Sequence, residues 1–147
     1  MSLEENKTIV RRWVDATNKQ NLSLYDDLVA SDFVDHTRQV QGLENVKQFV
    51  TMVFKAFPDF HLTIEDIIAE GDKVWVRAKI TMTHTIEYRG IAPTGKKITE
   101  RSVSINRIVD GKIMEQWYVT DDVDFYKQLG VIEYTEKGKK LFPDEAK

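Results

Sequence analysis

The first half of the chain carries apolar residues at helical spacing. Ile9, Trp13 and their neighbours recur every three or four positions up to a polar stretch at residues 18–21. Ser2 and Glu5 precede this stripe with the spacing of a capping box, in which each side chain bonds the backbone of the other. The pattern therefore predicts an amphipathic helix that begins directly after Ser2.

Two further helices are expected before residue 60. Ser23 with Asp26 repeats the capping signal, which predicts a short helix that carries Leu24 and Leu28. After a brief extended piece at residues 33–36, a third helix is predicted to open at Gly42. Pro58 ends it, because proline lacks a backbone donor and clashes with the preceding turn.

Beyond residue 58 the hydrophobic period changes from about 3.6 to two, which is typical of half-buried strands. A first strand is predicted from Phe60, and a long one from Lys73 to Thr85. Along the long strand one face collects the apolar side chains Val74, Val76, Ala78, Ile80 and Met82. Two more strands, at about 98–109 and 112–120, precede a short helix that ends at Gly130. Helices followed by strands indicate an α+β fold.

The turn between the last two strands decides which side chains face the interior. Asp110-Gly111 gives a two-residue loop, whereas residues 109–111 give a three-residue loop with a left-handed glycine. The three-residue loop sorts polar and apolar residues better, and we adopt it. One face then holds Val103, Ile105, Arg107, Ile113, Glu115, Trp117 and Val119, and the other holds Ser102, Ser104, Asn106, Ile108, Met114, Gln116, Tyr118 and Thr120.

Length and composition predict one domain over residues 1–147, with a polar C-terminal extension at 131–147. The hydrophobic fraction of 41% and charged fraction of 31% suit a globular protein rather than a disordered one. The net charge of −3 argues against nucleic acid or an anionic membrane as the main partner. No apolar run is long enough to span a bilayer, and no secretory signal is recognisable. Because the chain also has no cysteine, a cytoplasmic location is expected.

The residue inventory excludes several chemistries. With no cysteine there is no disulfide, thiol nucleophile or cysteine-bound metal. The three histidines, His36, His61 and His84, form no i, i+4 pair of the kind that binds zinc on a helix, so no metal site is predicted. Residues 90–97 resemble a phosphate-binding loop, but Lys97 replaces the required hydroxyl and no helix follows, which favours a plain turn.

A few side chains remain as candidates for chemistry. The acidic cluster of Asp121, Asp122 and Asp124 can provide a base or a cation site, but capping of the last helix is favoured. His84 extends the apolar face of the long strand and can exchange protons near neutral pH, and His36 is similarly placed beside Asp35. Trp13, Trp75 and Trp117 are interpreted as core or interface aromatics.

Several strings, in this order, resemble one family. They are FVDHT, AFPDFHLTIEDIIAEGDKVWVRAKITMTHT, YRGIAPTGKKI, NRIVDGKIMEQW and DFYKQLG, and they span about residues 5–130. Together they resemble the SnoaL-like polyketide cyclases or ester cyclases. The resemblance implies the nuclear transport factor 2-like cone, with helices on a strongly curved, mixed but mainly antiparallel sheet that encloses an apolar pocket. It implies no cofactor, a hydrophobic small molecule as ligand, and a homodimer or homotetramer formed through the outer sheet face.

The resemblance also locates a site. Family cyclases use an aspartate on the last strand as general acid and base for an aldol ring closure, in a string close to Glu-His-Trp-Asp. Here the string is Glu115-Gln116-Trp117-Tyr118, which puts Tyr118 at the aspartate position, and Ser104 falls where another pocket histidine is found. An ordinary tyrosine titrates near pH 10, so Tyr118 is expected to donate a hydrogen bond rather than act as the base.

Three functions remain open. In an enzyme, Tyr118 donates a hydrogen bond and His84 or Asp121 supplies the base. In a binding protein, the same cavity holds an apolar ligand unchanged, and in a scaffold the cavity is filled by side chains. The polar lining mildly favours a ligand. The expected pocket lining consists of Trp13, His36, Phe54, Met82, Ser102, Ser104, Asn106, Met114 and Gln116.

Overall fold

The N-terminal helix α1 (Leu3–Asn18) begins where the capping box predicts, in a computed structural model that describes residues 1–144. The Ser2 side chain accepts a hydrogen bond from the Glu5 amide at 3.1 Å, and the Glu5 carboxylate accepts one from the Ser2 amide at 2.6 Å. Ile9, Val10 and Trp13 are buried on one face of the helix. The predicted amphipathic helix is confirmed.

The second predicted helix is divided between a 3₁₀ turn at Leu22–Leu24 and the single-turn helix α2 (Tyr25–Leu28). The prediction that Ser23 caps it is wrong, because its hydroxyl bonds the Asn21 side chain at 2.6 Å instead. Helix α3 (Leu43–Ala56) follows Gly42, as predicted. The φ of +86° at Gly42 lies in the region that favours glycine, which explains why the helix opens there.

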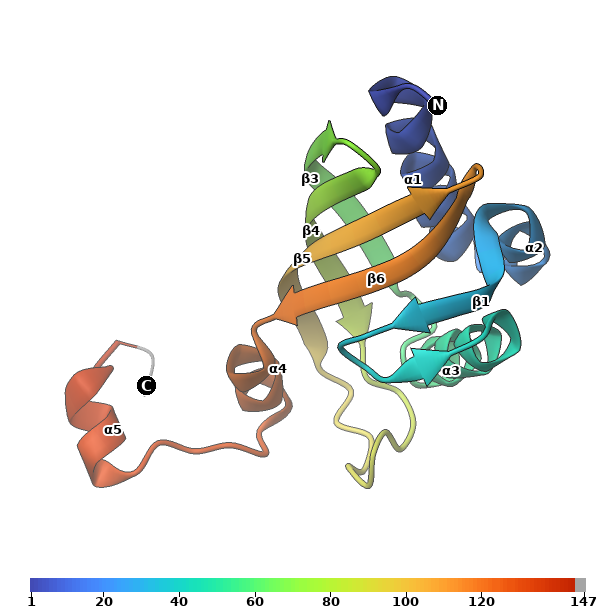
Figure 1. Cartoon of the computed structure of the whole chain (residues 1–147). Coiled ribbons are helices and arrows are strands. Elements are labelled where there is room, and N and C mark those ends of the chain that lie inside the picture. Colours follow the sequence, from blue (N-terminus) through green and yellow to red (C-terminus); the bar gives the residue numbers. More distant parts are fainter. Residues whose placement is uncertain (145–147) are drawn as a thin grey trace.

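Six strands form one sheet in the order β2-β1-β6-β5-β4-β3 (Figure 1). Strand β1 pairs with β6 in parallel and every other pair is antiparallel, which confirms the predicted mixed, mainly antiparallel sheet. The strands are β1 (Val29–Asp35), β2 (Val40–Gln41), β3 (His61–Glu70), β4 (Lys73–Thr83), β5 (Lys97–Val109) and β6 (Lys112–Thr120).

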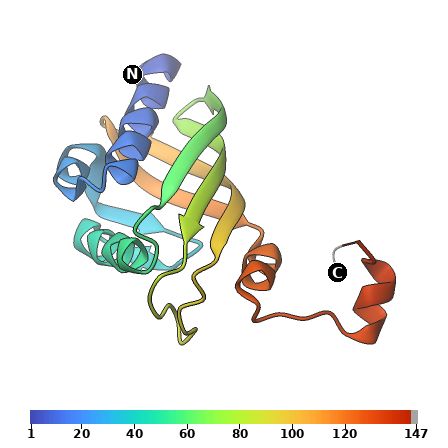
Figure 2. The ribbon, with the colours of Figure 1, turned by 180° about the vertical axis from the view of Figure 1, so that it is seen from behind.

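The sheet is curved and remains open, with β2 and β3 at its two edges (Figures 1 and 2). Helices α1 and α3 lie against the same face, which Figure 2 shows from behind. The apolar side chains of β4 point to this concave face and are buried, as the alternation predicts. The core therefore lies between the concave face and the helices.

The turn between β5 and β6 differs from the prediction. Asp110 and Gly111 form a two-residue loop, both with positive φ, and Val109 pairs with Lys112. A bulge then inserts Met114 into β6, so that Arg107 pairs with Glu115 and Asn106 with Gln116.

Beyond the bulge, the side chains of β6 therefore point to the same faces that a three-residue loop would give, although the paired residues differ. The predicted faces are therefore correct from Glu115 onward. They are wrong at Ile113, which is fully buried and pairs with Ile108 on the concave face.

The C-terminal part begins with helix α4 (Asp122–Leu129), which ends at Gly130 in the left-handed conformation, as predicted. The predicted loose extension at 131–147 is described as far as residue 144, and residues 145–147 lie outside the described residues. Its described part contains a short helix, α5 (Glu136–Leu141), which stands apart from the rest of the molecule (Figure 1). None of the helices in residues 1–144 is long and apolar enough to cross a membrane.

One side chain fastens α1 to the open edge of the sheet. The Asn18 amide donates to the Leu62 carbonyl at 2.8 Å, and its oxygen accepts from the Leu62 amide at 2.7 Å. Both backbone groups point away from β4, and no further strand pairs with them, because β3 is the edge strand of the sheet. Asn18 thus provides hydrogen-bond partners for this part of the edge strand and holds α1, which carries Trp13, over the concave face.

We expect Asn18→Ala to lower the free energy of unfolding by about 1–3 kcal/mol, because it leaves two backbone groups of β3 without partners. Urea denaturation followed by circular dichroism measures this loss. Asn45→Ala is the matched control, since Asn45 is exposed and makes a single bond to the Gln41 carbonyl. Equal losses for the two variants would contradict the assigned role.

Candidate functional site

A cavity of about 380 Å³ lies between the concave face of the sheet and the helices. Most of its wall is apolar and comes from α1, α3, the connection after α3, β3, β4 and α4; these residues are Trp13, Phe49, Val50, Val53, Phe54, Phe57, Phe60, Leu62, Ile80, Met82 and Phe125. Polar and charged side chains gather on the remaining wall: Thr37, Arg38, Tyr88, Arg89, Glu100, Tyr118, Thr120, Asp122 and Tyr126. An apolar molecule with a polar end suits a cavity with this lining.

Arg38 is held in the polar wall by Asp35, the buried last residue of β1. One Asp35 oxygen accepts from the backbone amides of Thr37 and Arg38 at 3.0 and 2.9 Å. The other oxygen accepts from the Arg38 guanidinium at 3.2 Å. That guanidinium lies 4.0 Å from the centre of the Tyr118 ring and 5.4 Å from that of Phe49. The charge is therefore fixed by one ion pair and two aromatic faces.

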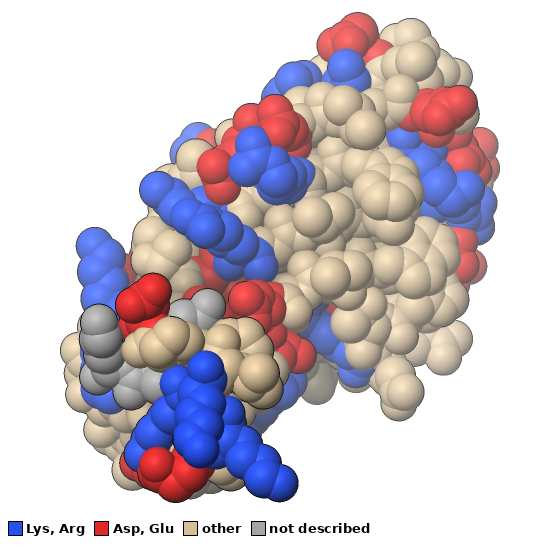
Figure 3. Space-filling view, turned by 90° about the vertical axis from the view of Figure 1, so that its left-hand side faces the viewer, with Lys and Arg blue, Asp and Glu red and all other residues tan. Residues whose placement is uncertain are grey.

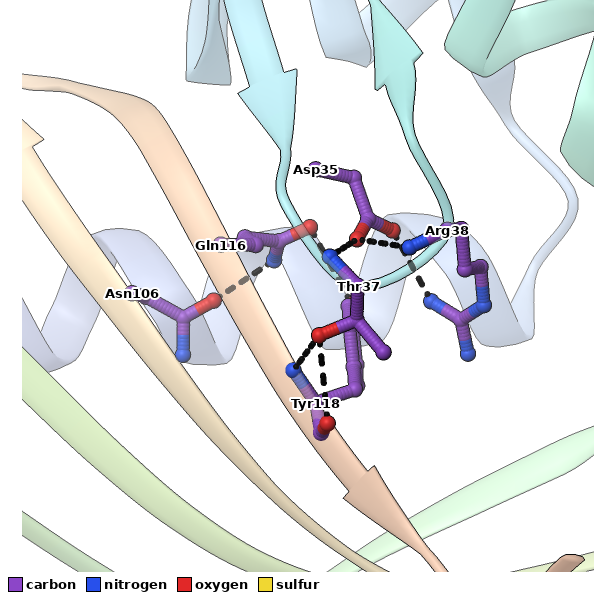
Figure 4. A network of polar contacts seen from close by, with 6 residues as sticks. All are labelled: Asp35, Thr37, Arg38, Asn106, Gln116 and Tyr118. Carbon is purple, nitrogen blue, oxygen red and sulfur yellow. Dashed lines mark hydrogen bonds and ion pairs between the residues drawn. The ribbon is translucent and has the colours of Figure 1, made fainter.

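Tyr118 is hydrogen-bonded on one side to the loop after β1, which also carries Arg38, and on the other side to residues of the sheet (Figure 4). Its backbone amide donates to the Thr37 hydroxyl at 2.8 Å. Its phenol donates to the Gln116 side-chain oxygen at 3.1 Å, and the Gln116 amide donates to the Asn106 oxygen at 2.5 Å. The Asn106 amide in turn donates to the Val74 carbonyl at 3.2 Å.

The Val74 carbonyl sets the direction of this chain, because a backbone carbonyl can only accept. Asn106 must turn its amide group to it and its oxygen to Gln116, which then presents its own oxygen to Tyr118. The Tyr118 phenol therefore donates its only hydrogen to Gln116 within the protein. The sequence predicted Tyr118 as a donor to the ligand, whereas in this arrangement a ligand meets the accepting side of its oxygen.

Burial raises the pKa of Tyr118 to about 12, although the nearby Arg38 opposes the rise. Near neutral pH the phenol is therefore protonated and is a poor base. This agrees with the expectation that the base is another group.

Glu100 is the pocket carboxyl best suited to exchange protons. It lies on β5 between Ile98 and Ser102 and points to the concave face, half-buried in the cavity wall. Burial raises its pKa from an ordinary 4.5 to about 7; Arg38 lowers it, and Asp122 and Asp121 raise it further. The β5–β6 register explains the contribution of Asp122, because Ser102 pairs with Thr120 and the next facing positions are 100 and 122.

Of the predicted site residues, Trp13, Phe54, Met82 and Tyr118 line the cavity. The two predicted bases do not. His84 is fully buried beside Phe57, and its Nδ1 accepts from the Thr94 amide at 3.3 Å, so it anchors the loop at residues 84–96. Asp121 caps α4 by accepting from the Asp124 amide at 3.1 Å, which is the capping role that the sequence favoured.

The other predicted lining residues also lie elsewhere. Ser102, Ser104, Asn106 and Gln116 are buried in the sheet beneath the cavity, where the last three belong to the hydrogen-bonded chain. Met114 is the bulge residue. His36 lies on the outer face, where it stacks on Trp117 with ring centres 4.8 Å apart and bonds Glu115 at 2.9 Å.

Arg38, Arg89 and Glu100 are pocket residues that the sequence reasoning did not find, and Asp122, which it named in the acidic cluster but interpreted as a cap, also lines the cavity. A signal existed for Glu100, because the alternation that places Ser102 and Ser104 on the concave face also places residue 100 there. A carboxyl at an otherwise interior position is a candidate acid or base. Arg38 gave no such signal, because it comes from a loop. Within residues 1–144, no three His, Asp or Glu side chains lie close enough to hold a metal ion.

Comparisons with known proteins agree with this architecture. The family model described as SnoaL-like polyketide cyclase matches residues 7–129. An aklanonic acid methyl ester cyclase, DauD from a Streptomyces species, is 28% identical over 142 residues, which cover 92% of this chain and 88% of that protein.

Two solved structures are also similar. AclR from Streptomyces galilaeus, a candidate hydroxylase, has a TM-score of 0.81 and 31% identity, covering 92% of this chain and 91% of that one. IdmH from Streptomyces antibioticus, a candidate polyketide cyclase, has a TM-score of 0.74 and 29% identity, covering 86% and 99%. The expected nuclear transport factor 2-like cone is confirmed, with the sheet left open.

Because the pKa of Glu100 is raised, we expect the free energy of unfolding to decrease as the pH increases. Between pH 4.5 and about 7 the folded protein holds a proton that the unfolded chain releases, so the free energy of unfolding decreases as pH rises through this window. Glu100→Gln removes this decrease. We expect the variant to gain up to about 3 kcal/mol over the wild type between about pH 4 and about pH 8, measured by urea denaturation.

Glu70→Gln is the control for this measurement, because Glu70 is exposed at the end of β3. Its stability should follow the wild type across the pH range. A gain for Glu100→Gln that does not change with pH would contradict the assigned pKa.

Proposed function

Because the chain belongs to the SnoaL-like polyketide cyclase family, we propose that it is a cofactor-free enzyme that moves protons on a hydrophobic carbonyl compound. The single observation that carries this proposal is Glu100. It is a carboxyl in the wall of an apolar cavity with a pKa of about 7, so both of its protonation states are populated near neutral pH. A group of this kind can take up a proton and return it.

The proposed reaction is a cyclase-type proton transfer and carbon–carbon bond formation. The Glu100 carboxylate removes a proton from the carbon beside a carbonyl group, and the electron pair of that C–H bond forms an enolate. The enolate carbon then attacks a second carbonyl of the same molecule, which forms one carbon–carbon bond and leaves an alkoxide. Glu100 returns its proton to the alkoxide, so the enzyme ends in its starting state.

The similar proteins support a substrate of this chemical class. Relatives from three Streptomyces strains or species are named aklanonic acid methyl ester cyclases. The apolar wall with Trp13, Phe54 and Phe57 suits an aromatic body, and the polar wall suits its carbonyl groups. We therefore propose an aromatic ester or ketone as the substrate.

Proton removal can be tested without the natural substrate. In D₂O, 2-acetonaphthone exchanges the protons of its methyl group for deuterium only after one of them has been removed, and NMR follows the loss of the methyl signal. We expect the wild-type protein to accelerate this exchange, with a rate that rises with pH through about 7. Glu100→Gln should lower the protein-dependent rate by about 100-fold or more.

Glu70→Gln serves again as the control and should exchange at the wild-type rate. Binding of 2-acetonaphthone without acceleration by the wild type would favour the alternative function, a protein that binds an apolar ligand and leaves it unchanged. Ring closure of aklanonic acid methyl ester, followed by chromatography, then tests the substrate class directly.

We also propose that two copies associate through the outer face of the sheet. Four apolar side chains lie in one row across β3, β4, β5 and β6, because Ile68 pairs with Trp75, Trp75 with Ile105, and Ile105 with Trp117. Ile68 is 64% exposed and Trp75 43%. Figure 3 shows a wide area without Lys, Arg, Asp or Glu on the face that it presents. An apolar row on a two-fold axis can bury itself against its own copy.

For this association we expect Trp75→Glu to weaken self-association about tenfold or more, because a charge replaces a central aromatic residue. Light scattering coupled to gel filtration measures the mass over a concentration series. Lys79→Gln, on the same face of β4 but outside the row, should keep the wild-type mass. A wild-type protein that is monomeric at every concentration would contradict the proposal.

A further inference from the structure

The Arg38 guanidinium is the most firmly held positive charge in the cavity wall. Asp35 occupies one of its five N–H groups, and the Tyr118 ring covers one face of its plane at 4.0 Å. Asp35 itself is 5% exposed and is satisfied by two backbone amides besides the guanidinium. The remaining part of the guanidinium belongs to the wall of the cavity.

The surroundings of Arg38 make it a binding group rather than a structural one. The Tyr118 ring covers one face of the guanidinium at 4.0 Å and Phe49 lies 5.4 Å away, while 30% of the Arg38 side chain remains exposed. A charge-assisted hydrogen bond beside these rings is stronger than one in open water. The neighbouring phenol cannot take over this task, since its proton goes to Gln116. An oxygen of the ligand at the polar wall therefore meets one fixed cation.

We propose that Arg38 forms an oxyanion subsite, which binds an enolate or phenolate oxygen of an aromatic ligand in the cavity. The proposal rests on the proposed function and deepens it, because removal of a proton from the substrate produces an enolate, whose negatively charged oxygen is the group that Arg38 would bind. It also specifies the ligand class beyond an aromatic carbonyl compound: the bound molecule carries an oxygen that becomes negatively charged in the site.

The charges of the cavity are consistent with this subsite. Arg38 and Arg89 are its cations, Glu100 and Asp122 line it as acids, and Asp35 is paired with Arg38. When Glu100 takes a proton from the ligand, one negative charge leaves Glu100 and one appears on the ligand oxygen. The net charge of the site does not change, and Arg38 attracts the charge in its new position. Arg89 is less suited, because its guanidinium donates to a neutral group, the Tyr126 hydroxyl, at 3.3 Å, whereas that of Arg38 is held by the Asp35 carboxylate.

A coloured phenol tests the subsite. 4-Nitrophenol absorbs visible light only as the phenolate, and 4-nitroanisole is its neutral analogue of similar shape. In buffer that keeps most free phenol neutral, we expect the wild-type protein to increase the phenolate absorbance and to bind 4-nitrophenol more tightly than 4-nitroanisole. Arg38→Met should remove the absorbance change and weaken 4-nitrophenol binding about tenfold or more, while 4-nitroanisole still binds.

The control is Arg101→Gln, which removes the same charge from an exposed position on β5 and should leave both ligands unaffected. The proposal is overturned if the wild type binds the neutral phenol, or if Arg38→Met keeps the phenolate absorbance. If Arg38→Met no longer binds 4-nitroanisole, Arg38→Lys decides, because it retains the positive charge. Phenolate absorbance kept by Arg38→Lys supports the subsite, and its loss overturns it.

This readout is separate from that of the proposed reaction. Glu100→Gln should still produce the phenolate absorbance although it loses deuterium exchange, since the anion binds to Arg38 and not to Glu100. A wild-type protein that shows Arg38-dependent phenolate binding but no exchange would retain the subsite and refute the acid–base function.

Discussion

The register between β5 and β6 is the constraint on which the rest of the site depends. The two-residue turn at Asp110-Gly111 would by itself place the wrong residues on the concave face, and the bulge at Met114 corrects it. Because side chains alternate along a strand, a shift of one residue would exchange the two faces of β6. Tyr118 and Gln116 would then point outward, and Trp117 would enter the core.

The register between β5 and β6 determines which side chains are neighbours on both faces of the sheet. On the concave side it aligns Asn106 with Gln116, which makes the hydrogen-bonded chain from the Val74 carbonyl to the Tyr118 phenol possible. On the convex side it aligns Ile105 with Trp117 and completes the apolar row. A buried chain of this kind is satisfied at every step, so it fixes the orientation of Tyr118 at little energetic cost.

The polar wall combines elements that are far apart in the sequence. Arg38 comes from the loop after β1, Glu100 from β5, and Asp122 from the start of α4. The parallel pairing of β1 with β6 brings the first of these beside Tyr118, and the antiparallel pairing of β5 with β6 brings the other two together. Their mutual influence follows from this placement, since burial and Asp122 raise the pKa of Glu100 while Arg38 lowers it. An apolar cavity with charges on one wall can thus direct a proton to and from a bound ligand.

The sequence by itself determined the elements and much of their orientation. The capping box at Ser2, the opening of α3 at Gly42, the buried face of β4 and the end of α4 at Gly130 are all local, since each depends on residues a few positions apart. The family resemblance, carried by strings along the chain, gave the cone. Tertiary structure alone decided which charged groups line the cavity. His84 and Asp121 are plausible bases in the sequence, but packing turns one against Phe57 and capping occupies the other. Arg38 and Glu100 lie 62 positions apart in the chain, and only strand pairing brings them to one wall.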